Sequence, residues 1–216
     1  KFCNKIFQAT KFVLMRLGDD YTPPATGALS GNESLVEKWV LHRLTQTSLK
    51  INEALESRDF FEATNAIYHF WLNDLCDVYI ENSKFLILEG NDIQRKSARD
   101  TLYTCIDAAL KLIHPFMPFI TEEMWQRLPK RSTETAVTIV KAEYPEYVKE
   151  YDNAEAESAY NLVLDITKSA RSLLAQYGIA KNAKVFIEAT KSEYYDIAAD
   201  QKTSIISLIK AVDDVT

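Results

Sequence analysis

Apolar residues recur every three to four positions along most of the first 128 residues, which predicts a series of amphipathic helices. The first runs over about residues 1–17, with Phe2, Ile6, Ala9, Val13 and Leu17 forming its core stripe. Further helices are expected over residues 34–55, 59–88 and 92–113, with Trp39 and Trp71 buried. Ser34–Glu37 has the form of a capping box, and Asp59 and Asp92 can cap the next two helices. Long helices with short connections predict an antiparallel bundle.

The pattern changes after residue 128. Residues 136–142 alternate weakly and suggest an extended arm, whereas residues 152–177 suit a long helix with a packing seam. A strand is expected at 184–189, a helix at 193–211, and another strand near the chain end. The expected fold class is therefore mainly α: an antiparallel helical bundle, followed by a long helix and a small, truncated α/β unit. The expected domains are 1–150 and 151–216.

The stretch HPFMPFITEEMW, residues 114–125, separates two helical patterns. It suggests either a catalytic corner, with His114 and Glu122–Glu123 as acid and base, or a structural corner between packed helices. No nucleophile or second base accompanies His114, which favours the structural interpretation. Pro115 ends the preceding helix. We expect Pro118 to keep the link extended and Thr121 to cap a short helix with both glutamates in its first turn.

Composition narrows the functional classes. The chain has 216 residues, of which 47% are hydrophobic, and no apolar run approaches a membrane span. Its three cysteines form no C-x-x-C pair, so we expect reduced thiols. Motifs for phosphate loops, dinucleotide binding, zinc proteases and serine hydrolases do not occur. We expect no catalytic residue, metal or cofactor in this chain. Because Lys1 lies inside a helical pattern, we expect the chain to be part of a longer protein.

Binding chemistry is concentrated near the start of the chain. Residues 1–18 carry four cations and no acid, although the whole chain has a net charge of −6. Lys5, Gln8 and Phe12 lie on one helical face, and single-stranded RNA is read by such aromatic, amide and cationic groups. The alternative is a solvated basic face on which Phe12 packs against a neighbouring element. Basic residues here and in the acid-free stretch 168–184 are candidate phosphate contacts: Lys1, Lys11, Arg16, Lys168 and Arg171.

Four segments carry a family resemblance: FCNKIFQATKFVLMRL, LVEKWVLHRL, YHFWLNDLCDVYIENSK and HPFMPFITEEMWQRL. In this order they resemble the anticodon-binding helical domain of class I aminoacyl-tRNA synthetases. The resemblance covers about residues 1–150. Within the family, Asn4-Lys5 and the run from Cys76 to Glu81 are most similar to the valyl branch. Residues 151–216 resemble, more weakly, the segment that follows in eukaryotic-type enzymes.

The resemblance implies roles for individual residues. Phe12 would stack on the middle anticodon base, Lys5 and Gln8 would lie near the third base, and Ile80 would lie close to the anticodon. Gln8 is often Asn in bacterial relatives, so its reach is one methylene longer.

The resemblance also implies a longer enzyme that joins valine to its tRNA with ATP and Mg. Its partners would be valine tRNA and the catalytic and editing domains, with no membrane. We expect a cytoplasmic protein, or a mitochondrial form of it. Two alternatives stay open: the same role in an isoleucyl or leucyl enzyme, and a helical protein-interaction module without RNA binding.

Overall fold

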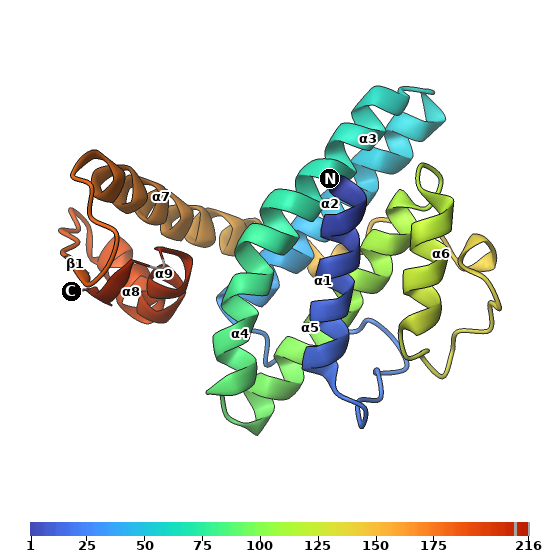
Figure 1. Ribbon diagram of the computed structural model, residues 1–216, viewed down its shortest axis with the longest axis horizontal. Helices are drawn as coiled ribbons and strands as arrows, with labels where there is room; N and C mark the ends of the chain where they lie inside the picture. The colour runs from blue at the N-terminus through green and yellow to red at the C-terminus, as the bar shows by residue number, and fades with distance from the viewer. Residues whose placement is uncertain (210, 216) are drawn as a thin grey trace. The chain divides into compact units, whose positions relative to one another are not determined.

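The computed structural model describes residues 1–209 and 211–215, and it confirms that the chain is mainly α-helical. The chain forms two compact units, Lys1–Asn153 and a second that begins at Ala154. The first unit is a helical bundle (Figure 1). Its α-helices are α1 (Phe2–Leu17), α2 (Leu35–Glu56), α3 (Phe60–His69), α4 (Ile80–Leu88), α5 (Asp92–Ile113) and α6 (Pro118–Arg127). A π-helix η1 (Phe70–Tyr79) and two 3₁₀ turns, η2 (Ile139–Lys141) and η3 (Lys149–Tyr151), complete it.

The core of the bundle follows the predicted apolar stripes. Trp39 and Trp71 are buried, and the Trp71 indole N–H donates to the Ala109 carbonyl at 3.3 Å. Helix α1 packs on the bundle through its buried residues Ile6, Ala9, Thr10, Val13 and Leu17. Phe2, which the sequence places in this stripe, is only half-buried and its ring lies 4.8 Å from the ring of Tyr68.

Two of the predicted helix starts are confirmed, and the third is shifted by one residue. The reciprocal bonds of the Ser34–Glu37 capping box are present, and the Asp59 carboxylate accepts from the Glu62 N–H at 3.0 Å. Helix α5 is capped by Asn91 rather than Asp92, because the Asn91 side chain accepts from Gln94 N–H at 2.9 Å.

The helix expected over residues 59–88 contains a change of winding. Residues 70–79 are π-helical, between α3 and α4. A π-helix bonds each N–H to the carbonyl five residues back, so side chains beyond it rotate relative to an uninterrupted α-helix. The sequence-based prediction assumes 3.6 residues per turn throughout, so it assigns the wrong helix face to residues after position 70.

The corner at residues 114–125 has the predicted structural role, but helix α6 begins earlier than predicted. Helix α6 begins at Pro118, which occupies the first helical turn, so the expected extended link and Thr121 cap are wrong. Thr121 is buried inside the helix, with its hydroxyl 2.7 Å from Nδ1 of His114. Partial burial lowers the pKa of His114, and the nearby Glu122 carboxylate opposes this shift. His114 thus joins the end of α5 to α6.

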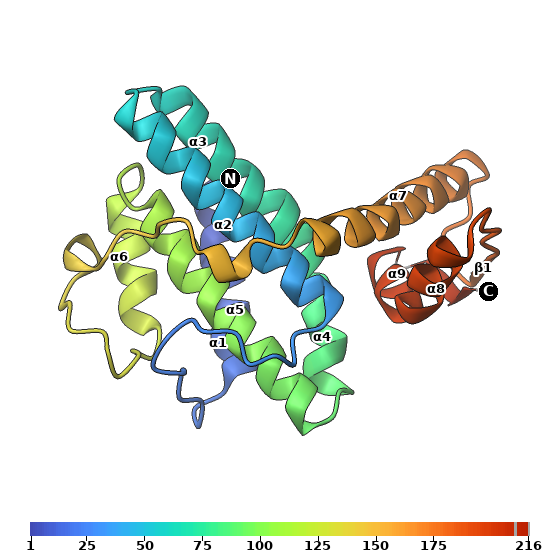
Figure 2. The ribbon, with the colours of Figure 1, turned by 180° about the vertical axis from the view of Figure 1, so that it is seen from behind.

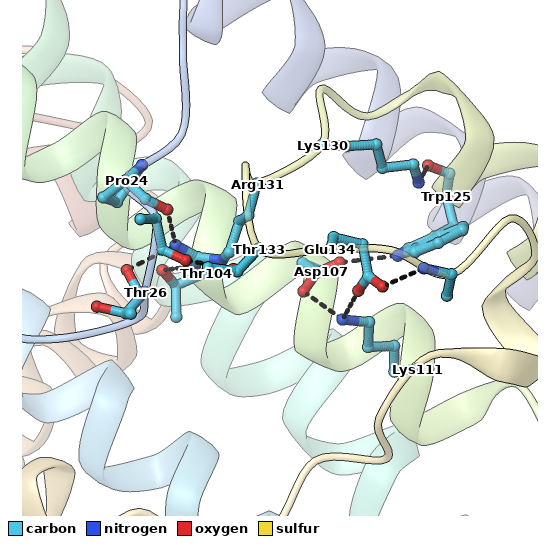
Figure 3. Close-up of polar contacts among 12 residues, drawn as sticks. Pro24, Thr26, Thr104, Asp107, Lys111, Trp125, Lys130, Arg131, Thr133 and Glu134 are labelled. Atoms are coloured by element: carbon cyan, nitrogen blue, oxygen red, sulfur yellow. Dashed lines mark hydrogen bonds and ion pairs between the residues drawn. The ribbon is translucent and has the colours of Figure 1, made fainter.

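A polar network fixes α6 and the loop after it onto α5 (Figure 3). The Trp125 indole N–H donates to Asp107 at 2.8 Å, and the Lys111 ammonium lies between Asp107 and Glu134. In the same loop, Arg131 donates to carbonyl oxygens of the α1–α2 loop. The corner is therefore a rigid junction of three segments.

The expected arm bonds to α6 through Val137 and Ile139, and the chain that follows it runs along α2 on the side of the bundle away from α1 (Figure 2). Residues 139–141 form a 3₁₀ turn rather than extended chain. Thr45 bonds both the N–H and the carbonyl of Val148, and Asn52 donates to the Pro145 carbonyl at 2.9 Å. These contacts leave the α1 side of the bundle uncovered by the arm.

The second unit contains α7 (Ala154–Gln176), β1 (Ala183–Val185), α8 (Ser192–Asp200), α9 (Lys202–Ile209) and β2 (Val212–Val215). Strands β1 and β2 pair in parallel, as a βα unit requires. The strand is shorter than the expected 184–189, and the helix expected over 193–211 is broken at Gln201 into α8 and α9. Lys210, within that expected helix, and Thr216 lie outside the described residues.

Candidate nucleic-acid interface

Helix α1 presents one buried and one exposed face. Its buried residues recur at helical spacing, so Lys5, Gln8 and Lys11 fall on the opposite side and are exposed. The helix ends at Gly18, whose φ of 79° lies in the left-handed region, and its N–H bonds the Leu14 carbonyl. The structure therefore leaves the Lys5 and Gln8 side chains accessible to a ligand.

Phe12 lies at the margin of this exposed face and is half-buried. Two cations lie near its ring: the Arg16 guanidinium is 5.0 Å from the ring centroid and the Lys84 ammonium is 5.6 Å away. Both distances are within the range of a cation–π contact. Part of the ring packs on its neighbours, as the structural alternative expected, while the remainder is open to solvent. The two interpretations are thus compatible at this residue.

Lys5 faces the η1 helix. Its ammonium nitrogen is 4.0 Å from Asp77 Oδ1, and the side chains are 56% and 66% exposed. An ion pair this open contributes about 0–1 kcal/mol and breaks readily. Asp77 therefore positions the Lys5 side chain loosely without closing it to RNA.

Helix α4 contributes a second, partly buried ion pair beside Phe12. The Lys84 ammonium donates to Glu81 Oε1 at 2.9 Å. The sequence interpretation did not select Asp77, Glu81 or Lys84 as site residues. These three residues are spaced four and then three positions apart, which indicates that they share one helical face. The sequence does not show that this face lies beside α1; the fold does.

Ile80 does not lie on this surface. Its side chain is 7% exposed and forms part of the core. The resemblance implied proximity to the anticodon, and the structure gives Ile80 a position beneath the surface that residues 77, 81 and 84 form. The Ile80 side chain is therefore not among the groups that this surface offers to RNA, because it follows the π-helical segment and points into the core.

The other predicted cations of α1 differ in their surroundings. Lys1 and Lys11 are exposed. Arg16 is half-buried, and its Nε is buried without a hydrogen-bond acceptor among the described residues. Of the three, Lys1 and Lys11 have the accessibility that a phosphate contact needs.

Cys76 lies next to this surface and adds no charge to it. Burial raises the pKa of its thiol to about 11, while the nearby Lys5 ammonium acts in the opposite direction. The thiol is therefore protonated at neutral pH. Cys3 is exposed on α1 and Cys105 is buried, and all three thiols are free.

The remaining two candidate phosphate contacts belong to the second unit. Lys168 is exposed on α7. The Arg171 guanidinium instead donates through Nε, at 3.1 Å, and through Nη2 to the carbonyl of Leu208 near the end of α9. These donors hold α9 against α7. Arg171 therefore has a structural role, which the lack of acidic residues around it in the sequence did not indicate.

Side chains typical of catalysis or metal binding lie apart. His42 Nδ1 accepts from the Asn153 N–H at 3.0 Å, and His69 is exposed on α3. Within residues 1–209 and 211–215, no group of three or more His, Cys, Asp or Glu side chains could hold a metal ion. Over the same residues, no helix has the length and apolar character to cross a membrane.

Comparison with known proteins identifies a matching family and several similar proteins. Residues 37–191 match the family described as the anticodon-binding domain of tRNA ligase. The chain is 68% identical over its whole length to the mitochondrial valine–tRNA ligase of Saccharomyces cerevisiae, of which it covers 20%. It is 48% identical, over 97% of the chain, to valine–tRNA ligase of Schizosaccharomyces pombe, and 40% identical, over 95%, to that of Mus musculus. The chain spans about a fifth of the length of these relatives.

Proposed function

This chain belongs to the anticodon-binding domain family of tRNA ligases, and on that premise we propose that its α1 surface binds the anticodon loop of a valine tRNA. The observation that carries the proposal is the partly open Phe12 ring beside Lys5 and Gln8, which are exposed on the same helix. Aromatic stacking, an amide and cations are the groups that read unpaired bases.

Each residue has a distinct task in this proposal. Phe12 is the stacking platform for the middle anticodon base, a contact worth about 1–3 kcal/mol. Lys5 and Gln8 lie toward the N-terminus of α1 from Phe12, and in this proposal they meet the edge of the third base. Lys1 and Lys11 hold phosphates through charge, which is independent of the base sequence. The bundle positions these groups because the buried stripe of α1 fixes the rotation of the helix.

We further propose that the chain acts within a longer valine–tRNA ligase. The relatives named above carry that name and are about five times longer than the matched segment. In such an enzyme, ATP and Mg would serve valine activation in a catalytic domain, and an editing domain would be a further partner. The role of this chain would be to position the tRNA. Aminoacylation assays of the full-length protein with valine, isoleucine and leucine separate this proposal from an isoleucyl or leucyl enzyme.

The compartment of the longer protein is also a proposal. The Saccharomyces cerevisiae relative carries a mitochondrial name, whereas the Schizosaccharomyces pombe and Mus musculus names specify no compartment. We propose that this protein serves translation in the cytoplasm, with a mitochondrial form as the alternative. Cell fractionation of the full-length protein with both compartment markers distinguishes them.

A protein-interaction module remains the second candidate, because one observation favours it. The predicted seam of α7 is buried at Ala156, Val163 and Ala170 but opens at Leu173 and Tyr177, which are 55% and 72% exposed. Leu173→Ser and Tyr177→Ser in the full-length protein would abolish a protein contact made by this seam and leave tRNA affinity unchanged. Loss of tRNA affinity in Phe12→Ala, without such a change in the seam variants, supports the RNA-binding function.

A further inference from the structure

The ion pair between Lys84 and Glu81 lies beside the proposed stacking platform, with the ammonium over the Phe12 ring. Lys84 Nζ is 2.9 Å from Glu81 Oε1 and 5.6 Å from the centre of the Phe12 ring. The Lys84 side chain is 39% exposed and that of Glu81 is 21% exposed. An ammonium group this close to a partly open aromatic ring is within reach of any nucleotide that stacks there.

A second ion pair of the same kind lies further along α1. Lys5 pairs with Asp77, and Asp77 and Glu81 are four residues apart on consecutive helical segments. One helix edge thus supplies two carboxylates, each facing a lysine of the proposed RNA surface. Without RNA, these carboxylates offset part of the positive charge around Phe12.

We propose that Lys84 is a further RNA-contacting residue, and that Glu81 holds it beside Phe12 until a phosphate of the bound RNA replaces the carboxylate. This inference rests on the function proposed above, because it requires a base stacked on Phe12. The backbone of that nucleotide brings a phosphate close to the ring, and the Lys84 ammonium already lies over the ring, 5.6 Å from its centroid. The ammonium changes partner and keeps its charge, so no proton is transferred.

The exchange requires little free energy because both side chains remain partly in solvent, and such pairs are weak. A phosphate also releases condensed counterions when a lysine neutralises it, which a carboxylate does not. Glu81 therefore has two effects: it orients the Lys84 stem along the platform, and it lowers the attraction for RNA that does not stack on Phe12.

The test is a double-mutant cycle in the full-length protein, with tRNA affinity measured over a range of salt concentrations. Lys84→Gln should weaken tRNA binding about fivefold and reduce the slope of log affinity against log salt by about 0.7–1. Lys84→Arg should restore the slope, which a variant that merely disturbs folding would not do. An unchanged slope in Lys84→Gln overturns the proposal.

Glu81→Gln is the second single variant of the double-mutant cycle. It should tighten binding about twofold to threefold when Lys84 is present, and by clearly less in the Lys84→Gln background, where only repulsion between the carboxylate and phosphate is removed. An equal gain in both backgrounds would mean that Glu81 only repels RNA, and would contradict the assigned pairing. Glu123→Gln is the matched control, because it removes one charge from an exposed Glu–Arg pair on α6; it should reproduce wild-type binding.

Phe12→Ala distinguishes a failure of the proposed RNA-binding function from a failure of the proposed role of Lys84. If Phe12→Ala weakens binding but Lys84→Gln does not change the slope, the function stands and the role of Lys84 fails. If neither variant changes tRNA binding, both the proposed function of this surface and the role of Lys84 fail.

Discussion

Lys5 on α1 and Asp77 on η1 face each other between the two helices, with Nζ and Oδ1 4.0 Å apart and both side chains exposed. The proposed RNA surface is thus shared between two segments that are distant in sequence. Gln8 is exposed about one turn from Lys5 on the same helix, so the two side chains together suit hydrogen bonding to the edge of a base.

Lys5→Ala should therefore relax discrimination at the third anticodon position and barely change the salt dependence of binding. The measurement is the affinity of the full-length protein for tRNAs that differ only at that base, at several salt concentrations. Lys11→Ala is the comparison variant, because Lys11 is exposed on the same helix. As a phosphate contact, it should weaken binding of every anticodon alike and reduce the salt slope by about one. If Lys5→Ala behaves like Lys11→Ala, the base-reading role is wrong.

The corner should matter for stability and leave anticodon choice unchanged. Trp125 is 1% exposed and donates to Asp107, so Trp125→Ala should reduce the free energy of unfolding by about 3–5 kcal/mol. Pro118→Ala should cost only about 0.4–1 kcal/mol, because proline at the first helical turn mainly restricts the unfolded chain. Urea unfolding measures both, and a Trp125→Ala variant with altered discrimination among anticodons would contradict the purely structural role.

Lys130 gives the fold a defined pH dependence. Burial, assisted by the Lys111 cation, lowers the pKa of Lys130 from 10.5 to about 8, against the opposing carboxylates of Asp107 and Glu134. The folded state then disfavours the protonated ammonium, so this group destabilises the fold below pH 8. Between about pH 8 and 10.5 the unfolded chain binds more protons, and the free energy of unfolding rises with pH.

The Lys130→Met variant should lack that rise. The decisive quantity is the difference in unfolding free energy between wild type and variant, because titration of other groups cancels in it. The exposed Lys96, replaced in the same way, should follow the wild-type curve. A difference that stays constant from pH 8 to 10.5 would show that the Lys130 pKa is not lowered.

Arg171 should act on stability rather than on RNA. Arg171→Met removes two donors to the Leu208 carbonyl and should lower the unfolding free energy of the second unit by about 1–3 kcal/mol. The salt slope of tRNA binding should not change. Lys168→Met, on the same helix, tests the phosphate contact that remains a prediction: it should reduce the slope and leave stability near wild type. A reduced slope in Arg171→Met at full stability would reverse the assignment.

Much of the architecture follows from the sequence because it depends on local signals. The apolar stripe of α1, the Ser34 capping box and the cap at Asp59 each act within a few residues, and the structure confirms them except for Phe2, which is only half-buried. The start of α6 was misplaced because Pro118 suits both an extended link and a first helical turn. The sequence-based prediction is the extended link, and no local signal near Pro118 distinguishes it from a helix start.

The candidate site was less predictable because it depends on which helices lie side by side. The π-helical segment changes the rotation of α4, so Ile80 turns inward while Lys84 reaches Phe12. No periodicity in the sequence signals that change of winding. The cap that Arg171 provides for α9 likewise depends on a contact between residues far apart in sequence. The local pattern therefore selected the exposed face of α1 but not Asp77, Glu81 and Lys84, which the fold brings beside it.

The most direct test of the account is tRNA recognition by the full-length protein with Phe12→Ala. Affinity and kcat/KM for valine tRNA should fall by an amount equivalent to about 1–3 kcal/mol, with weakened discrimination at the middle anticodon base. Valine-dependent ATP–pyrophosphate exchange should stay near wild type, because activation is assigned to another domain. Unchanged tRNA affinity and unchanged anticodon discrimination in a folded Phe12→Ala protein would contradict the account and confine Phe12 to packing.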